Sequence, residues 1–137
     1  MRFRRNRIAA LMVVPLLGAA VAAGAWAEYR HEQNKLRMRA EALTGGNVQR
    51  GQRAFLSYGC GGCHSLRGVR GARGLVGPPL DGIATRAIIA GHLQNTPGNL
   101  TRWIADPQAV APGTAMPRLG VAEGDRRDIA AFLYTRS

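Results

Sequence analysis

The chain lacks a second pair of cysteines, because Cys60 and Cys63 are the only two and lie three residues apart. A structural zinc site normally needs four ligands, and the other histidines, His31 and His92, are isolated. No run alternates between apolar and polar residues well enough to predict a β-strand. No internal repeat is visible. These absences disfavour a zinc module, a β-sheet domain and a repeat protein.

Charge is also absent between residues 8 and 27, "IAALMVVPLLGAAVAAGAWA". As a helix, such a run spans about 30 Å, the thickness of a bilayer's hydrocarbon core. The basic stretch "MRFRRNR" precedes it, as in exported proteins. Two interpretations remain, a membrane anchor and a signal peptide cleaved after Ala25-Trp26-Ala27. The run exceeds the usual signal-peptide core of about 7–15 residues, which favours the anchor.

Composition divides the rest of the chain into two parts. Residues 28–44 are charged and poor in large apolar side chains, which predicts a solvated linker. Residues 45–137 then form one small domain. Proline and glycine recur along it, so we expect an all-α domain of short helices and long loops.

The two cysteines belong to the motif Cys60-Gly61-Gly62-Cys63-His64, the C-x-x-C-H signature of covalent c-type haem attachment. Cysteines at this spacing reach the two vinyl groups on one edge of the porphyrin, and the next residue turns its imidazole toward the iron. We therefore predict one haem c, tethered by Cys60 and Cys63, with His64 as an iron ligand. A thioredoxin-like redox pair would need a βαβ setting. A disulfide across so short a loop would stabilise little.

The motif also bears on location. Basic residues are equally numerous on the two flanks of the apolar run, so the positive-inside rule does not orient it. In bacteria, c-type haem is attached outside the cytoplasm. We therefore expect the haem domain in the periplasm, held at the bacterial inner membrane, or secreted to the periplasm if the leader is cleaved.

Met116 is the candidate for the second axial ligand, which decides whether a haem carries electrons or binds small molecules. It lies in "APGTAMPRLG", a loop stiffened by Pro112-Gly113 and Pro117. The alternatives are a Met116 that only fills an apolar gap and ligation by His92, which lies among polar residues. The sequence favours Met116.

Three further segments extend the pattern: "GNVQRGQRAF", "NLTRWIADPQAVAPGTAMP" and "IAAFL". With them, residues 46–136 resemble the class I c-type cytochromes, and most closely the cytochrome c domain of bacterial haem–copper oxidase subunit II. The resemblance implies a small class I cytochrome c fold behind an N-terminal membrane helix. Gly51 and Phe55 would then lie where the first helix of the fold crosses the last, on which Ile129, Phe132 and Leu133 share one face.

The resemblance also assigns roles around the haem. The Pro78 carbonyl in "VGPPL" would bind the other nitrogen of His64, Trp103 would cover the haem face, and Thr114 would meet a propionate. The long omega loop of mitochondrial cytochromes is missing, so Arg86 becomes a candidate propionate partner, or else a solvated surface arginine.

Together these features predict a membrane-tethered monohaem electron carrier in a respiratory chain, delivering to a terminal oxidase, and not an enzyme on its own. One alternative is a permanent haem c subunit of a larger oxidase, nitric oxide reductase or dehydrogenase. Another is a catalytic or gas-sensing haem protein with a labile sixth ligand.

The domain is basic. From Thr44 onward there are eleven arginines against five acids and no lysine, a formal balance of +6 before the haem propionates. Part of this excess is ordinary solvation. Four of the arginines flank the haem segments, and these are expected to steer acidic docking faces: Arg67, Arg70, Arg73 and Arg118. The expected partners are a terminal oxidase, a cytochrome bc complex or a dehydrogenase, together with the membrane. Nucleic acid is excluded by the location.

Overall fold

The computed structural model describes residues 2–136, with side chains from residue 15 onward. The chain forms two compact units, Met1–Lys35 and Leu36–Ser137. In the part of the chain that the structure describes, no helix is both long and apolar enough to cross a membrane. The membrane helix predicted over residues 8–27 therefore gains no support. Its residues 8–14 lie outside the described side chains.

Helix α1 (Arg2–Thr44) forms the first unit and extends into the second. It includes the whole of the predicted linker, residues 28–44, which is therefore helical. One side of the last turn of α1 is buried, since Ala40 and Thr44 are buried whereas Ala42 and Leu43 are exposed. The Thr44 hydroxyl donates a 2.7 Å hydrogen bond to the Ala40 carbonyl. The sequence predicted that the domain starts at residue 45, whereas the second unit starts earlier, at Leu36.

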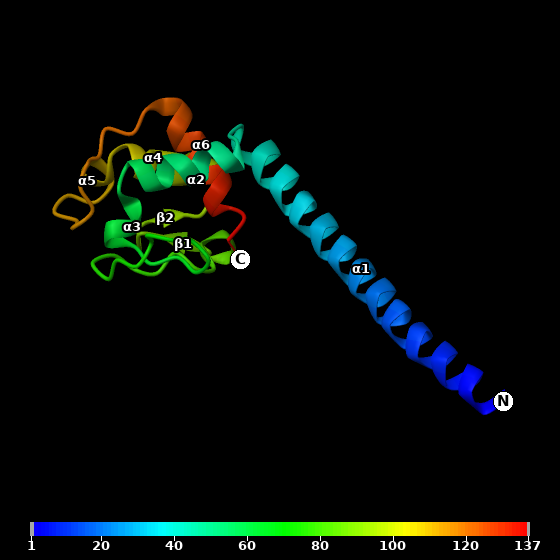
Figure 1. The fold of residues 1–137 in the computed structure, drawn as a ribbon. Helices are drawn as coiled ribbons and strands as arrows, with labels where there is room; N and C mark the ends of the chain where they lie inside the picture. Colours follow the sequence, from blue (N-terminus) through cyan, green and yellow to red (C-terminus); the bar gives the residue numbers. More distant parts are fainter. Residues whose placement is uncertain (1, 137) are drawn as a thin grey trace. The chain divides into compact units, whose positions relative to one another are not determined.

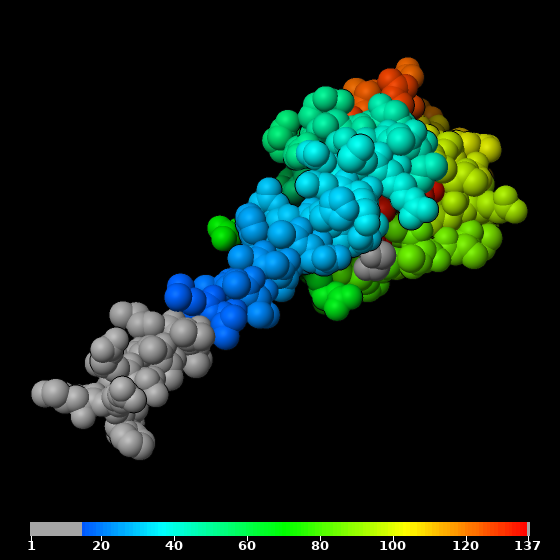
Figure 2. Space-filling view, turned by 90° about the vertical axis from the view of Figure 1, so that its right-hand side faces the viewer, coloured from blue at the N-terminus to red at the C-terminus, as the bar shows by residue number. Residues whose placement is uncertain are grey.

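Short helices joined by loops make up the rest of the second unit, as expected (Figure 1). In chain order they are α2 (Val48–Ser57), α3 (Cys60–Cys63), the 3-10 helix η1 (Ile83–Thr85), α4 (Pro97–Ala105), α5 (Pro107–Val110) and α6 (Glu123–Leu133). Segments distant in the sequence, coloured cyan, yellow-green and orange, share one surface of this unit (Figure 2).

The expectation of no strands is wrong at one place. Strands β1 (Ile88–Ile89) and β2 (Leu93–Gln94) pair antiparallel in a small hairpin. Its three-residue loop, residues 90–92, contains Ala90 at φ 52° and Gly91 at φ 73°, and glycine adopts a positive φ at little cost. Strands of two residues are too short to show an alternating pattern, so the sequence could not reveal them.

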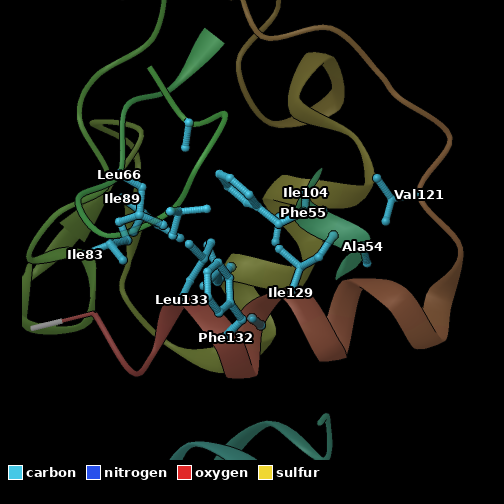
Figure 3. Close-up of a cluster of buried hydrophobic side chains, with 14 residues drawn as sticks. Ala54, Phe55, Leu66, Ile83, Ile89, Ile104, Val121, Ile129, Phe132 and Leu133 are labelled. Atoms are coloured by element: carbon cyan, nitrogen blue, oxygen red, sulfur yellow. The ribbon is translucent and has the colours of Figure 1, made fainter. Parts of the chain in front are cut away.

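The core lies where α2 packs against α6 (Figure 3). A Cβ at Gly51 would fall 1.8 Å from the Asp128 carbonyl oxygen, so only glycine allows the two backbones to approach this closely. One turn further along α2, the Phe55 ring packs on Phe132 with centroids 5.6 Å apart. The crossing predicted at Gly51 and Phe55 is therefore confirmed, and it fixes the helix that leads into the cysteine motif.

Asp128 closes the same crossing with an ion pair. Its carboxylate accepts hydrogen bonds from Arg50 Nε at 2.6 Å and from the Asn47 backbone N–H at 2.6 Å. Burial raises the pKa of Asp128, but the Arg50 and Asn47 hydrogen bonds outweigh it and bring the pKa below its usual value. The first residues of α2 are thereby tied to the middle of α6.

Candidate functional site

A cavity of about 400 Å³ in the second unit is lined by all seven residues that the sequence singled out. They are Cys60, Cys63, His64, Pro78, Trp103, Thr114 and Met116. Apolar side chains form much of the remaining wall, among them Phe55, Leu100, Ile104, Ile129 and Leu133. Two thiols, an imidazole and a thioether therefore converge, from segments far apart in the chain, on one apolar cavity.

The cysteine motif is the single turn of α3. Gly59 precedes it at φ 73°, a conformation that glycine adopts at little cost. The His64 backbone N–H donates to the Cys60 carbonyl at 2.9 Å, which places the histidine directly after the turn. No disulfide joins the two cysteines. Burial raises the pKa of Cys60, helped by the neighbouring Cys63, so its neutral thiol form is favoured.

The orientation of the His64 ring is fixed by the next loop. Its Nδ1 lies 2.8 Å from the Pro78 carbonyl oxygen, the contact that the resemblance implied. With the proton on Nδ1, this nitrogen donates to the carbonyl and Nε2 keeps its lone pair for a metal.

Gly77, which the sequence analysis did not single out, completes this arrangement. A Cβ there would lie 2.3 Å from His64 Cε1. The Gly77 N–H donates to the Cys63 carbonyl at 2.8 Å. Glycine is therefore required for the loop to close on the imidazole. The only signal in the sequence was its place before Pro78.

The loop that carries Met116 is held by Gln108, another residue that the sequence did not indicate. Its amide Nε2 donates to the Thr114 carbonyl at 2.7 Å and to the Met116 carbonyl at 3.0 Å. Its Oε1 accepts from the Gly113 N–H at 3.2 Å. One side chain thus fixes the backbone on both sides of the predicted ligand. A glutamine after a proline gives no pattern by which to find it.

Two residues with open roles can now be placed. His92 is exposed at the turn of the β1–β2 hairpin and does not line the cavity, which favours the surface interpretation. Arg86 does line the cavity. Its Nη2 donates to the backbone carbonyls of Pro79 and Asp81 at 2.6 and 2.9 Å. Its role toward a propionate stays a prediction.

The four arginines expected near the haem fall into two pairs. Arg67 Nε lies 3.1 Å from Asp81 Oδ1, and Arg118 forms an ion pair with Asp106. Arg70 and Arg73 are exposed, and within residues 15–136 neither forms an ion pair. Half of the set is therefore compensated within the chain.

These residues fit a c-type haem. The apolar wall suits the faces of the porphyrin, and the thiols of one α3 turn border the cavity beside the imidazole. The steric closeness of Gly77 to His64 fixes the ring in one place. His64 and Met116 offer the nitrogen and sulfur ligands of electron-transfer haems.

Comparison with known proteins agrees with this fit. The family model for cytochrome c matches residues 48–137. The "Cytochrome c oxidase subunit 2" of Alkalihalophilus pseudofirmus is 38% identical over 58 residues, which is 42% of this chain and 17% of that protein. The chain thus spans only a small part of this relative. No solved structure matches.

The matched region contains the α2–α6 crossing, the cysteine motif and the Met116 loop. A cytochrome c domain implies covalent haem c and electron transfer. The chain therefore belongs to the cytochrome c family, as a class I c-type cytochrome that resembles the oxidase subunit II domain.

Proposed function

We propose that the protein is a monohaem electron carrier, tethered to the bacterial inner membrane, that passes single electrons in the periplasm to a terminal oxidase. One observation carries the electron-transfer part of this proposal: Cys60, Cys63, His64 and Met116 line the same apolar cavity. The apolar run over residues 8–27 motivates the tether. The partial similarity to an oxidase subunit motivates the choice of acceptor.

Each residue has a defined task in this proposal. When bound, haem c supplies one-electron oxidation and reduction at its iron. Cys60 and Cys63 would tether it through thioethers, and His64 and Met116 would ligate its iron. The Pro78 carbonyl orients His64. Phe55, Leu100 and the other apolar wall residues exclude water.

The same ligand pair argues against catalysis at the iron. Small-molecule binding needs an open or labile axial position, and Met116 is held in its loop by the Gln108 hydrogen bonds. We therefore propose a carrier and not an enzyme. Slow or absent carbon monoxide binding to the ferrous protein is the expected result, and rapid binding would favour a gas-sensing or catalytic haem.

The test of the ligand set is Met116→Ala in the haem-loaded protein. We expect loss of the ferric methionine-to-iron charge-transfer band and a lower reduction potential, because the thioether ligand is gone. Met38→Ala is the matched control, since Met38 is exposed on α1. This variant should leave the charge-transfer band and the reduction potential unchanged. An unchanged band in Met116→Ala would refute the assignment of Met116 as an iron ligand.

The intact mass of the purified protein is a separate measurement. It reports whether one haem is attached and whether residues 1–27 are retained.

A second function, that of a permanent haem subunit in a larger oxidoreductase, is favoured by the relative named as an oxidase subunit. Purification in mild detergent separates the two proposals. Co-migration with a stoichiometric partner supports the subunit, and a monodisperse single chain supports the carrier. Recovery of the chain in the membrane fraction, with residues 8–27 retained, is expected for the tether.

A further inference from the structure

Leu75 and Val76 are the two most exposed large apolar side chains in the described part of the second unit, at 89% and 71%. They lie in the loop between the cysteine motif and Pro78, drawn in green beside α3 in Figure 1. Leu75 does not line the haem cavity, so a bound haem would not account for its exposure. Val76 does line it and connects Leu75 to the rim of the cavity.

The loop holds these side chains in a fixed position. Before them, the Gly74 N–H donates to the Gly61 carbonyl at 2.9 Å, and a Cβ on Gly74 would fall 2.2 Å from the Gly62 carbonyl oxygen. After them, the Gly77 N–H donates to the Cys63 carbonyl at 2.8 Å. Both ends of the Gly74–Gly77 segment are therefore fastened to α3. Leu75 is therefore exposed because the fixed backbone of this loop holds it at the surface, and not because the segment is mobile.

Rigid exposure of an aliphatic side chain contributes nothing to folding, whereas burying it against a partner is favourable. A small apolar contact of this kind fits a transient complex, whose interfaces lie at the low end of the size range. The charged neighbours specify the partner. Arg70 and Arg73 in the same loop are exposed and form no ion pair within residues 15–136, whereas Arg67 is compensated by Asp81.

We propose that Leu75, with Val76 beside it at the rim of the cavity, is the apolar centre of a docking surface that has Arg70 and Arg73 at its edge. The partner is a redox protein whose own docking face has an apolar centre and an acidic edge. This inference rests on the proposed electron-carrier function, since the surface adjoins the cavity lined by Cys63 and His64. In each encounter one electron leaves the reduced protein and is taken up by the oxidised partner. Apolar contact gives short-range affinity, and the arginines raise the encounter rate.

Leu75→Ser in the haem-loaded protein tests the apolar centre, with Leu43→Ser as the matched control. Leu43 is also an exposed leucine but borders a different groove, with Arg102 and Arg126. The assay is oxidation of the reduced protein by a detergent-solubilised terminal oxidase from the same organism. We expect Leu75→Ser to raise KM about tenfold, as expected for loss of one buried leucine, with kcat unchanged. The ratio of the KM of Leu75→Ser to that of the parent should be the same at low and high salt. Leu43→Ser should have the KM and kcat of the parent.

A footprint that needs no electron transfer completes the test. Photochemical labelling of residues 74–77 is compared with and without the oxidase, and with and without a solubilised cytochrome bc complex. Protection by either complex supports the docking surface, even if the oxidase does not oxidise the protein and the proposed acceptor is wrong. Oxidation by the oxidase with no protection and no change in Leu75→Ser would overturn the docking surface and leave the carrier function standing. Absence of both oxidation and protection would overturn both.

Discussion

At the scale of single residues, the position of Met116 depends on a side chain that is not itself a ligand. Gln108 donates two hydrogen bonds, to the carbonyls of Thr114 and Met116, and accepts one from the Gly113 N–H. A thioether is a weak ligand, and a stiff loop keeps it in place by reducing the number of other conformations available to it. Pro112 and Pro117 restrict the chain on either side, and Gln108 fixes the part between them.

Gln108→Ala should therefore loosen the methionine ligand without removing it. The three hydrogen bonds lost in Gln108→Ala, at about 1 kcal/mol each, should raise the population of the detached state by more than tenfold. Carbon monoxide binding to the ferrous protein is expected to speed up by a similar factor, and the methionine-to-iron band should weaken on mild warming. Stopped-flow spectrophotometry measures the first and absorption spectroscopy the second.

The control for this variant is Gln52→Ala on the exposed face of α2, which should bind carbon monoxide as the parent does. Gln108→Glu adds a sharper comparison, because it keeps the side-chain size and loses both donors. If Gln108→Glu and Gln108→Ala bind carbon monoxide no faster than the parent, the loop is held by the prolines alone.

At the scale of elements, α6 lacks the start that a helix usually has. Ala122 is at its N-cap and makes no side-chain capping bond. The Tyr58 hydroxyl, from the end of α2, accepts from the Ala122 N–H at 3.3 Å and donates to Asp125 Oδ2 at 2.8 Å. A residue far away in the sequence thus supplies the missing cap. Such long-range compensation leaves no local signal.

The Arg50–Asp128 pair joins the same two helices and predicts a pH dependence. The pKa of Asp128 is lower in the folded protein than its usual value of 3.8. Its contribution to stability is therefore fully present above about pH 4, and it is lost as the pH falls through the folded pKa. Asp128→Asn should lower the free energy of unfolding at pH 7 by about 2 kcal/mol, the value typical of hydrogen bonds to a charged group.

Denaturant unfolding of the parent and of Asp128→Asn, from pH 7 to pH 2, measures this contribution. The difference between the two should shrink steadily below pH 4, because the parent carboxylate is then protonated. Glu123→Gln is the control, since Glu123 pairs with Arg127 on an exposed surface where ion pairs contribute little. A difference that stays constant down to pH 2 would show that Asp128 acts through packing and not through charge.

At the scale of the whole molecule, the sequence predicted the residues that touch the haem site better than those that hold them. The C-x-x-C-H motif and the proline-bounded methionine are local patterns, and the four residues named from them line one cavity. The three residues that the family resemblance implied line it too: Pro78, Trp103 and Thr114. The α2–α6 crossing at Gly51 and Phe55 was predicted from the family resemblance, and the structure contains it. Gln108, Gly77 and the Tyr58 cap were missed, because each acts through a backbone group of another segment.

The pairing of surface charges also depends on contacts between distant segments, which the sequence does not reveal. The sequence gives eleven arginines and five acids from Thr44 onward, but it does not show which charges cancel. In the structure four acids pair with arginines, and the fifth, Asp125, accepts from Tyr58. The positive excess therefore resides on the remaining arginines. Arg70 and Arg73 carry it beside the haem motif, whereas Arg118 is compensated by Asp106.

The last prediction concerns this excess and needs no identified partner. Oxidation of the reduced haem-loaded protein by hexacyanoferrate(III), a small anion, should slow steeply as salt is added, since exposed charges are screened within about 8 Å at physiological ionic strength. Arg70→Glu should lower the low-salt rate several-fold and flatten the salt dependence, because it reverses an uncompensated charge near the site of electron exit.

The control is Arg102→Glu, which makes the same change in charge at a residue of the groove that Leu43 borders. It should change the oxidation rate and its salt dependence much less. Stopped-flow rates across a salt series measure all three proteins. Equal slopes for Arg70→Glu and Arg102→Glu would mean that only the total charge matters and that the arginines beside the haem motif have no special role.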